Sequence, residues 1–248
     1  MRVTAFTLAL LAVLPAGCTK TRVVHSRYVI QTEAAGAQCS YTWQPGDYWE
    51  FLAWALLDDV SSSSVLAITA GYMPEVLPSS GTEITIPIPE EYEKAARDRM
   101  ESARLIRRAT DIRESDRNGC MRLLREANNK DKSWSVPVTN ITVMLLEDGK
   151  TDEALELLGP MCHKNTPALI LAGIAWRQGN TEGALRHLSE ALIGTSPRPE
   201  ILAAAGIAWS VTGEREIAGN IVRRLLENPD APSELRVLAL RYVLMLGE

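Results

Sequence analysis

Residues 172–176 read Ala-Gly-Ile-Ala-Trp, and the same five residues recur at 205–209, displaced by 33 positions. Chance rarely repeats a pentapeptide that contains both glycine and tryptophan. Periods of about 20–50 residues indicate stacked structural repeats. A glycine follows each copy, at Gly179 and Gly213, and a second helix is expected after each glycine. The duplication therefore predicts repeated helical pairs in the second half of the chain.

Small residues recur where the paired helices would cross, and prolines follow the second helices. The small residues, 34, 30 and 34 positions apart, are Cys120, Ala154, Ala184 and Ala218, and the prolines are Pro167, Pro197 and Pro232. These residues resemble tetratricopeptide (TPR) repeats, in which small side chains let two helices approach closely. The resemblance implies a mainly α fold, with an α-solenoid of about four TPR-like hairpins over residues 90–231 and a capping helix at 232–248. An unrelated helical bundle is the alternative.

The first helices of such repeats line a concave groove that binds peptides or helices in the family. Aligning the repeats on the pentapeptide places an apolar row in this groove and assigns Trp176 and Trp209 to the core. An apolar groove calls for an apolar ligand or an intramolecular plug. The candidate partner-binding residues are Val143, Ile170, Ile174, Arg177, Ala203, Ile207 and Ser210.

A shorter region before the repeats has a different pattern. Residues 41–43 are β-prone, and Asp47 is placed to cap a helix over residues 48–57. The serine run 61–64 offers the next cap, and residues 83–87 alternate like a closing strand. The order strand, helix, helix, strand predicts a small βααβ module within residues 28–89.

This module resembles a LysM domain, which binds N-acetylglucosamine-containing glycans such as peptidoglycan. The matching residues are Tyr41-Thr42, Pro45-Gly46-Asp47, Ala53, Leu77-Pro78, Gly81 and Ile84-Thr85-Ile86-Pro87. The resemblance implies that sugars lie between the first strand–helix loop and the second helix–strand loop, where tyrosines can stack on sugar faces. The candidate glycan-binding residues are Gly46, Asp47, Tyr48, Gly71 and Tyr72. A structural role for the tyrosines is the alternative, since Tyr48 replaces the usual threonine and Ala70-Gly71 the usual asparagine.

The helix expected at residues 48–57 is apolar on nearly every side. A helix of this kind is normally buried, and a module of under about 50 residues cannot cover it alone. Residues 87–90 lead into the next helix without a flexible Gly/Ser-rich linker. We therefore expect the module to pack against the helical region. Contact with the long helix at residues 90–111 is easier than insertion into the groove.

The N-terminal residues are typical of a secretory signal peptide. Arg2 precedes an apolar run at residues 4–14, and small residues then lead to Cys18. A charged start, a short apolar core and a small-residue exit define such signals, and the run is too short to span a bilayer. Residues 1–17 are therefore expected to be removed.

The ending Ala16-Gly17-Cys18 resembles a bacterial lipobox, which implies that Cys18 carries acyl chains. Residues 18–27 would form a lipid-anchored stalk. Thr19 stands where an aspartate would favour the inner membrane, so the same resemblance implies the outer membrane, facing the periplasm. Ordinary secretion with unmodified Cys18 is the alternative.

Composition argues against several classes of function. Removal of residues 1–17 takes away one arginine and leaves 25 basic against 31 acidic residues, a formal net charge of −6. This balance gives no reason to expect nucleic-acid binding. Cys39, Cys120 and Cys162 form no CxxC pair and share no metal-ligand spacing with the histidines. We expect no metal, no cofactor and no enzymatic activity, because the sequence has no nucleophile–base pairing or phosphate loop.

Two functions remain, and both place a lipoprotein at the outer membrane. The favoured hypothesis is a scaffold that binds an unidentified protein partner through the repeats and peptidoglycan through the module. The alternative is an assembly or pilot lipoprotein for an envelope secretion or export complex. In that case the LysM-like module is a spacer without glycan binding.

Overall fold

The computed structural model describes residues 38–89, 92–162, 164–193, 197–229 and 231–245. The residues of the predicted signal peptide, Cys18, Thr19, the stalk and the first ten residues of the module lie outside these ranges. Most of the described residues are helical, and one small sheet lies on the N-terminal side. They divide into two compact units, one before and one after the boundary between residues 141 and 142, and the described part of the second ends at residue 245. The mainly α class expected from the sequence is confirmed at this level.

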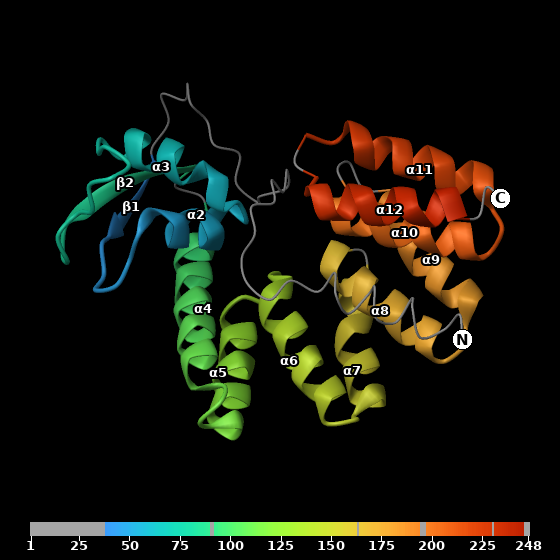
Figure 1. Ribbon diagram of the computed structural model, residues 1–248. Helices are drawn as coiled ribbons and strands as arrows, with labels where there is room; N and C mark the ends of the chain where they lie inside the picture. The colour runs from blue at the N-terminus through green and yellow to red at the C-terminus, as the bar shows by residue number, and fades with distance from the viewer. Residues whose placement is uncertain (1–37, 90–91, 163, 194–196, 230, 246–248) are drawn as a thin grey trace. The chain divides into compact units, whose positions relative to one another are not determined.

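The first unit begins with the expected βααβ order (Figure 1). Strand β1 (Gln38–Thr42) pairs antiparallel with β2 (Glu83–Pro89), and Tyr41 lies opposite Ile84. Between the strands come α2 (Trp49–Leu57), a 3-10 turn η1 (Val60–Ser62) and α3 (Ser63–Thr69). Ile84, Ile86 and Ile88 are buried while Thr85 is exposed, so the alternating pattern places one face of the sheet against the helices.

A long helical pair completes this unit. Helix α4 (Glu93–Ile112) packs against α2, and α5 (Arg117–Lys130) lies alongside α4 (Figure 1). Helix α2 buries almost its whole surface, including Leu52 and Leu56. The expected contact between the apolar helix and the first long helix is therefore confirmed.

Neither of the two expected helix caps forms its side-chain hydrogen bond. Tyr48, not Asp47, is the N-cap residue of α2, and its side chain makes no capping bond. Ser62, from the expected serine run, stands at the N-cap position of α3, but its side chain makes no capping bond. The hydroxyls of Ser61 and Ser62 both donate to Asp59 at 2.6 Å, and Asp59 itself caps η1 by accepting from the Ser61 N–H.

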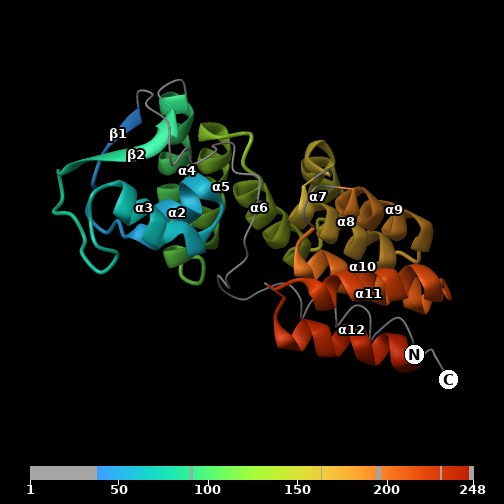
Figure 2. The same ribbon diagram turned by 90° about the horizontal axis from the view of Figure 1, so that it is seen from above.

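The second unit consists of consecutive helices, entered through α6 (Ser135–Glu147). The others are α7 (Thr151–Leu158), the 3-10 turn η3 (Gly159–Met161), α8 (Asn165–Arg177), α9 (Thr181–Leu192), α10 (Pro199–Val211), α11 (Arg215–Glu227) and α12 (Ser233–Met245). Helix α8 packs against α9 and α10 against α11, while α12 lies against both α10 and α11 (Figure 2). The duplicated pentapeptide falls in α8 and α10, the first helices of two successive pairs.

The turns that join the helices of each pair are alike. The Gly179 N–H donates to the Trp176 carbonyl at 3.0 Å, and the following Asn180 N–H donates to Ala175 at 2.9 Å. Such paired bonds satisfy the last carbonyls of a helix and require a left-handed residue, which glycine supplies without a steric penalty. The same two bonds and a φ between 72° and 91° recur at Gly149, Gly179 and Gly213.

Alanines dominate the core of the second unit. Ala184, fully buried on α9, and Ala218, buried on α11, lie at the expected crowding positions. Trp176 and Trp209 belong to the same core, as expected. At Gly206 of α10, a methyl group would lie 3.0 Å from a Val222 methyl carbon of α11. Small side chains therefore set the distance between the helices.

Candidate functional site

The first predicted sugar loop is turned toward α4. Asp47 is buried, and its Oδ2 atom accepts a hydrogen bond from the Gln44 N–H at 2.9 Å and one from the Tyr41 hydroxyl. The Arg104 guanidinium, from α4, lies 3.3 Å from the same oxygen and also donates to Tyr41. Asp47 therefore organises the loop and binds the helix.

Tyr41 is held at this junction in its protonated form. Burial and the hydrogen bond to Asp47 raise the pKa of the Tyr41 hydroxyl far above its ordinary value, although the Arg104 charge opposes this. The Arg104 guanidinium also lies 5.7 Å from the centre of the tyrosine ring. Tyr41, Asp47 and Arg104 thus form one cluster that combines a neutral hydroxyl with two opposite charges. Its hydrogen bonds, together with the contact between the guanidinium and the tyrosine ring, join β1, the following loop and α4.

The backbone of the same loop is also occupied. The Gly46 carbonyl accepts a hydrogen bond of 2.7 Å from Arg107 of α4. The Arg107 guanidinium lies 4.5 Å from the centre of the Phe51 ring, within cation–π range. Gly46 has a φ of 79°, which an L side chain rarely adopts. These contacts occupy the carbonyl of Gly46, a residue that the LysM resemblance assigns to the sugar-binding loop.

The second predicted loop is more open. Gly71, with a φ of 83°, turns the chain after α3, and Tyr72 is half-buried with its ring 5.8 Å from that of Trp49. Tyr48 is 43% exposed and lies against Phe51. The two tyrosines are thus available at the module surface, each supported by an aromatic side chain of α2.

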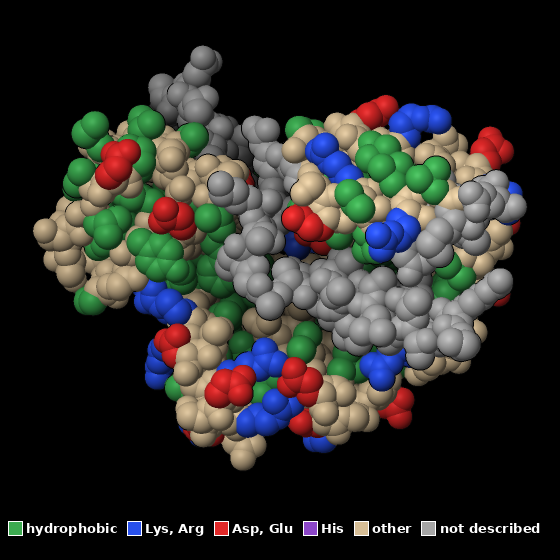
Figure 3. Space-filling view, viewed as in Figure 1, with side chains coloured by type: hydrophobic (Ala, Val, Ile, Leu, Met, Phe, Trp, Pro, Cys, Tyr) green, Lys and Arg blue, Asp and Glu red, His purple; other side chains and the backbone are tan. Residues whose placement is uncertain are grey.

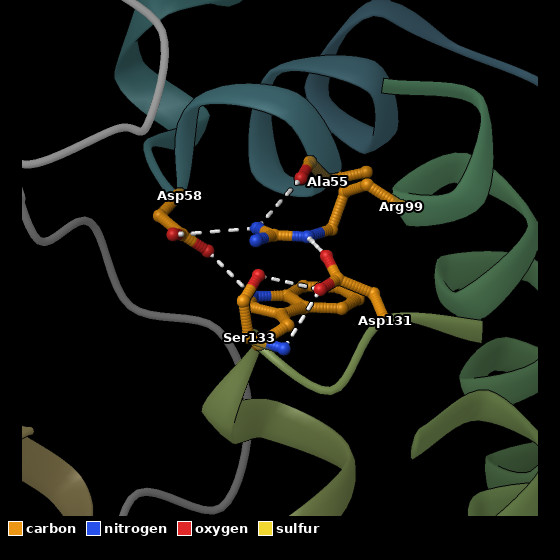
Figure 4. Close-up of polar contacts among 6 residues, drawn as sticks. Ala55, Asp58, Arg99, Asp131 and Ser133 are labelled. Atoms are coloured by element: carbon orange, nitrogen blue, oxygen red, sulfur yellow. Dashed lines mark hydrogen bonds and ion pairs between the residues drawn. The ribbon is translucent and has the colours of Figure 1, made fainter. Parts of the chain in front are cut away.

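A second cluster joins the end of α2 to α4 and α5 (Figure 4). Arg99, only 4% exposed, binds Asp131 at the end of α5 and lies 3.6 Å from Asp58 at the end of α2. The Trp134 indole N–H donates to Asp58 at 2.7 Å, and the Arg99 guanidinium lies 4.6 Å from the Trp134 ring centre. Trp54 packs on Trp134 with the ring centres 4.9 Å apart.

The charge of Asp131 is stabilised despite its burial. Desolvation by itself raises the pKa of this carboxyl, but a 2.5 Å hydrogen bond from the Ser133 hydroxyl and the Arg99 charge outweigh it. The net result is a pKa below the ordinary aspartate value. A buried ion pair becomes stable only when its remaining polar atoms are hydrogen-bonded, and Ser133 supplies that partner.

Sequence reasoning missed the residues that make these two clusters: Arg99, Arg104, Arg107, Asp131 and Trp134. One signal was present. Residues 38–89 contain no lysine or arginine but six acidic residues, whereas the helix that follows is rich in arginine. Opposite charges in adjacent segments favour their contact.

A cleft of about 250 Å³ lies between β1 and α4. Its lining includes the apolar side chains of Ile86, Ala96 and Met100. Gln44, Arg97 and Arg104 are among its polar residues. It includes neither Tyr48 nor Tyr72, so it is separate from the predicted sugar position.

The predicted partner groove contributes largely to packing. Ile170, Ile174, Ala203, Ile207 and Ser210 are buried, Val143 is half-buried and Arg177 is exposed. Three of the buried residues lie on α10, and α12 packs against that helix. The predicted groove residues of α10 therefore do not form an open apolar row. Partner binding by the predicted groove residues stays a prediction.

Within the described ranges, no group of histidine, cysteine and acidic side chains is placed to hold a metal ion. None of the described helices is both long and apolar enough to cross a membrane. No family model, curated protein or solved structure matches the chain.

Proposed function

We propose that this chain is a lipid-anchored scaffold of the bacterial outer membrane that binds a protein partner. Its parts would be a LysM-like module and an α-solenoid of about four TPR-like hairpins. The observation that carries the repeat part of this proposal is the duplicated pentapeptide in α8 and α10, each copy of which is followed by the same glycine turn, at Gly179 and Gly213. Identical turns with a duplicated pentapeptide in α8 and α10 support a repeat rather than an irregular bundle.

The geometry of the module favours the assembly or pilot form of this function. The carbonyl of Gly46 and the carboxylate of Asp47 are bound by Arg107 and Arg104. A sugar would have to displace these contacts to use the same atoms. The module is then a fixed support next to the helices, with weak glycan binding at most.

Peptidoglycan retention is the second candidate, because Tyr48 and Tyr72 lie at the surface on aromatic supports. Retention by purified sacculi distinguishes the two forms. We expect little retention and no change with Tyr48→Ala. Strong retention that Tyr48→Ala removes would show that the module binds glycan.

Membrane anchoring and partner binding are tested together. Cys18→Ser should abolish lipid labelling and move the protein to the soluble envelope fraction. The lipidated wild type, cross-linked in native membranes and purified, should bring down one partner in constant ratio. Ala184→Leu, which disturbs the α8–α9 pair, should lose that partner while lipid labelling persists. Labelling that survives Cys18→Ser would overturn the anchor, and purification without a constant partner would overturn the scaffold.

A further inference from the structure

The module exposes an unusual number of large apolar side chains on one connected surface. We call it the α3 patch, and it consists of Tyr48, Val65, Ile68, Met73, Val76 and Leu77. Their exposed fractions run from 43% for Tyr48 to 68% for Met73. Green side chains accordingly gather over α2 and α3 in Figure 3. Clustered apolar exposure of this kind marks an interaction surface, whereas single exposed residues do not.

Hydrogen bonds hold the parts of the α3 patch together. Val65 and Ile68 are three residues apart in α3 and share a helix face. The Tyr72 N–H donates to the Ala67 carbonyl at 2.9 Å, which folds the next loop back onto α3. The Trp49 indole N–H donates to the Val76 carbonyl at 2.8 Å. The patch is thus formed before any partner arrives, which lowers the entropic cost of binding.

Two exposed glutamates border the apolar side chains of the patch, while Arg107 of α4 lies against Phe51 at the Tyr48 edge. Of the six acidic residues between positions 38 and 89, Asp47 and Asp58 face arginines of α4. Glu50 and Glu75 are exposed, the first beside Trp49 and the second within the turn that carries Met73 and Val76. In Figure 3 red side chains interrupt the green surface of the module, and blue side chains begin where α4 emerges.

This charge decides among the occupants. Two copies of the chain that met patch to patch would bring acidic residues against acidic residues, and an anionic membrane surface would repel Glu50 and Glu75. We propose that the α3 patch docks a segment of a partner protein in which apolar side chains are flanked by lysine or arginine. The apolar atoms would cover Ile68 and Met73, and the basic groups would meet Glu50 and Glu75. This surface is separate from the repeats, so the inference does not depend on a partner in the repeat groove.

The test uses the secreted form of the chain, purified without detergent as Cys18→Ser. The probe is a fluorescent helical peptide of about 18 residues, five turns, with leucine on one face and lysine on the other. A matched peptide has glutamate in place of lysine. Anisotropy titrations should show binding of the lysine peptide and about tenfold weaker binding, or none, of the glutamate peptide. Raising the ionic strength from about 0.1 M to about 1 M should weaken the binding of the lysine peptide, because charge interactions are screened.

Two variants connect the binding to the patch. Ile68→Lys places in the patch a positive charge of the same sign as the peptide's lysines. It should weaken the binding of the lysine peptide about tenfold. Ile193→Lys is the matched control, since Ile193 is 83% exposed in the other unit, and it should have no effect. Circular dichroism of both variants checks that the fold is retained.

Three results would overturn the proposal. The first is equal binding of the two peptides, or equal binding by wild type and Ile68→Lys. The second is competition by soluble chitin oligomers, which would assign the surface to sugar. The third is sedimentation of the wild type with anionic vesicles, or concentration-dependent dimerisation, that Ile68→Lys abolishes.

Discussion

Residues 38–141 and residues 142–245 are both compact, but different contacts hold them together. In the first unit, arginines of α4 reach across 44 to 63 residues of sequence to Ala55, Tyr41 and Gly46. In the second unit, buried alanines and repeated glycine turns join helices that are neighbours in sequence. The first unit therefore depends on a few distant polar contacts, and the second on many local apolar ones.

This difference predicts how each unit fails. Loss of one charged partner leaves a buried charge uncompensated, which is costly and depends on pH. Loss of close packing costs less at any one site, because the surrounding helices relax in part. Hydrogen exchange measured by mass spectrometry can assign each loss to one unit, since peptides from the two units are separable.

The largest effect is expected at the Arg99 cluster. Asp131→Asn removes the charge that pairs with the buried Arg99 and should lower the free energy of unfolding by about 3 kcal/mol at neutral pH. Asp58, 3.6 Å from Arg99, keeps the loss from being larger. Urea unfolding followed by tryptophan fluorescence measures the change, and faster hydrogen exchange should be confined to residues 38–141. The control is Asp111→Asn, an exposed site on α4, the helix that carries Arg99. This substitution should change the free energy of unfolding little.

The same substitution predicts a pH dependence. Because the pKa of Asp131 is lowered in the folded state, its charge stabilises the protein fully above the ordinary value of 3.8. That stabilisation is lost as the pH falls through the lower, folded-state pKa. The difference between wild type and Asp131→Asn should therefore be largest near pH 7 and shrink below about pH 4. A difference that stays constant down to pH 2 would show that the Asp131 charge is not what stabilises the unit.

The next effect belongs to the second unit. Ala184→Leu forces a larger side chain into a fully buried position between α8 and α9 and should cost about 2 kcal/mol. The measurement is the urea midpoint, with faster exchange expected in α8 and α9 rather than in α2 or α4. Arg186→Leu introduces the same side chain at an exposed position of the same helix, where it overpacks nothing, and should be nearly neutral. Equal losses in the two variants would contradict the proposed helix crossing.

The glycine turns and the packing of α2 on α4 could be predicted from the sequence, and the polar residues that hold the module to α4 could not. The turns at Gly179 and Gly213 could be predicted because their hydrogen bonds join residues only three to five positions apart. Asp47 was expected to cap α2, since a local cap is the only partner that a sequence suggests. Its actual partner, Arg104, lies 57 residues away and is chosen by which face of α4 meets the module.

The candidate sites follow the same rule. Tyr48 and Tyr72 could be predicted to lie at the module surface from loop positions alone. The groove residues could not be placed, because burial of Ala203 and Ile207 depends on packing within the second unit. Arg99 is an arginine in an otherwise polar helix, and nothing in its neighbours distinguishes it from a solvated charge.

A smaller effect tests the repeated turn. Gly179→Ala places a methyl group at a φ of 76°, where the structure has no atom within 4 Å of it, so backbone strain alone is measured. The expected loss is about 1 kcal/mol, from the steric penalty of left-handed backbone. Gly159→Ala is the control, because that site also has open space but has no positive φ, and it should show no loss. If both substitutions are neutral, the turn does not hold the conformation described.

The smallest net effect is expected at Gly206, and it sharpens the contrast between tight and open packing within one pair of helices. Alanine in place of a glycine inside a helix gains about 0.5–1 kcal/mol when nothing obstructs it. Gly219→Ala on α11 meets no atom within 4 Å and should show that full gain. In Gly206→Ala on α10, the new methyl group meets the Val222 methyl carbon at 3.0 Å, and this contact offsets the gain. The free energy of unfolding should therefore stay nearly unchanged or fall. Thermal melts of the two variants measure the difference. An equal gain at both sites would mean that α10 and α11 are further apart than the structure has them, and that small residues do not set their spacing.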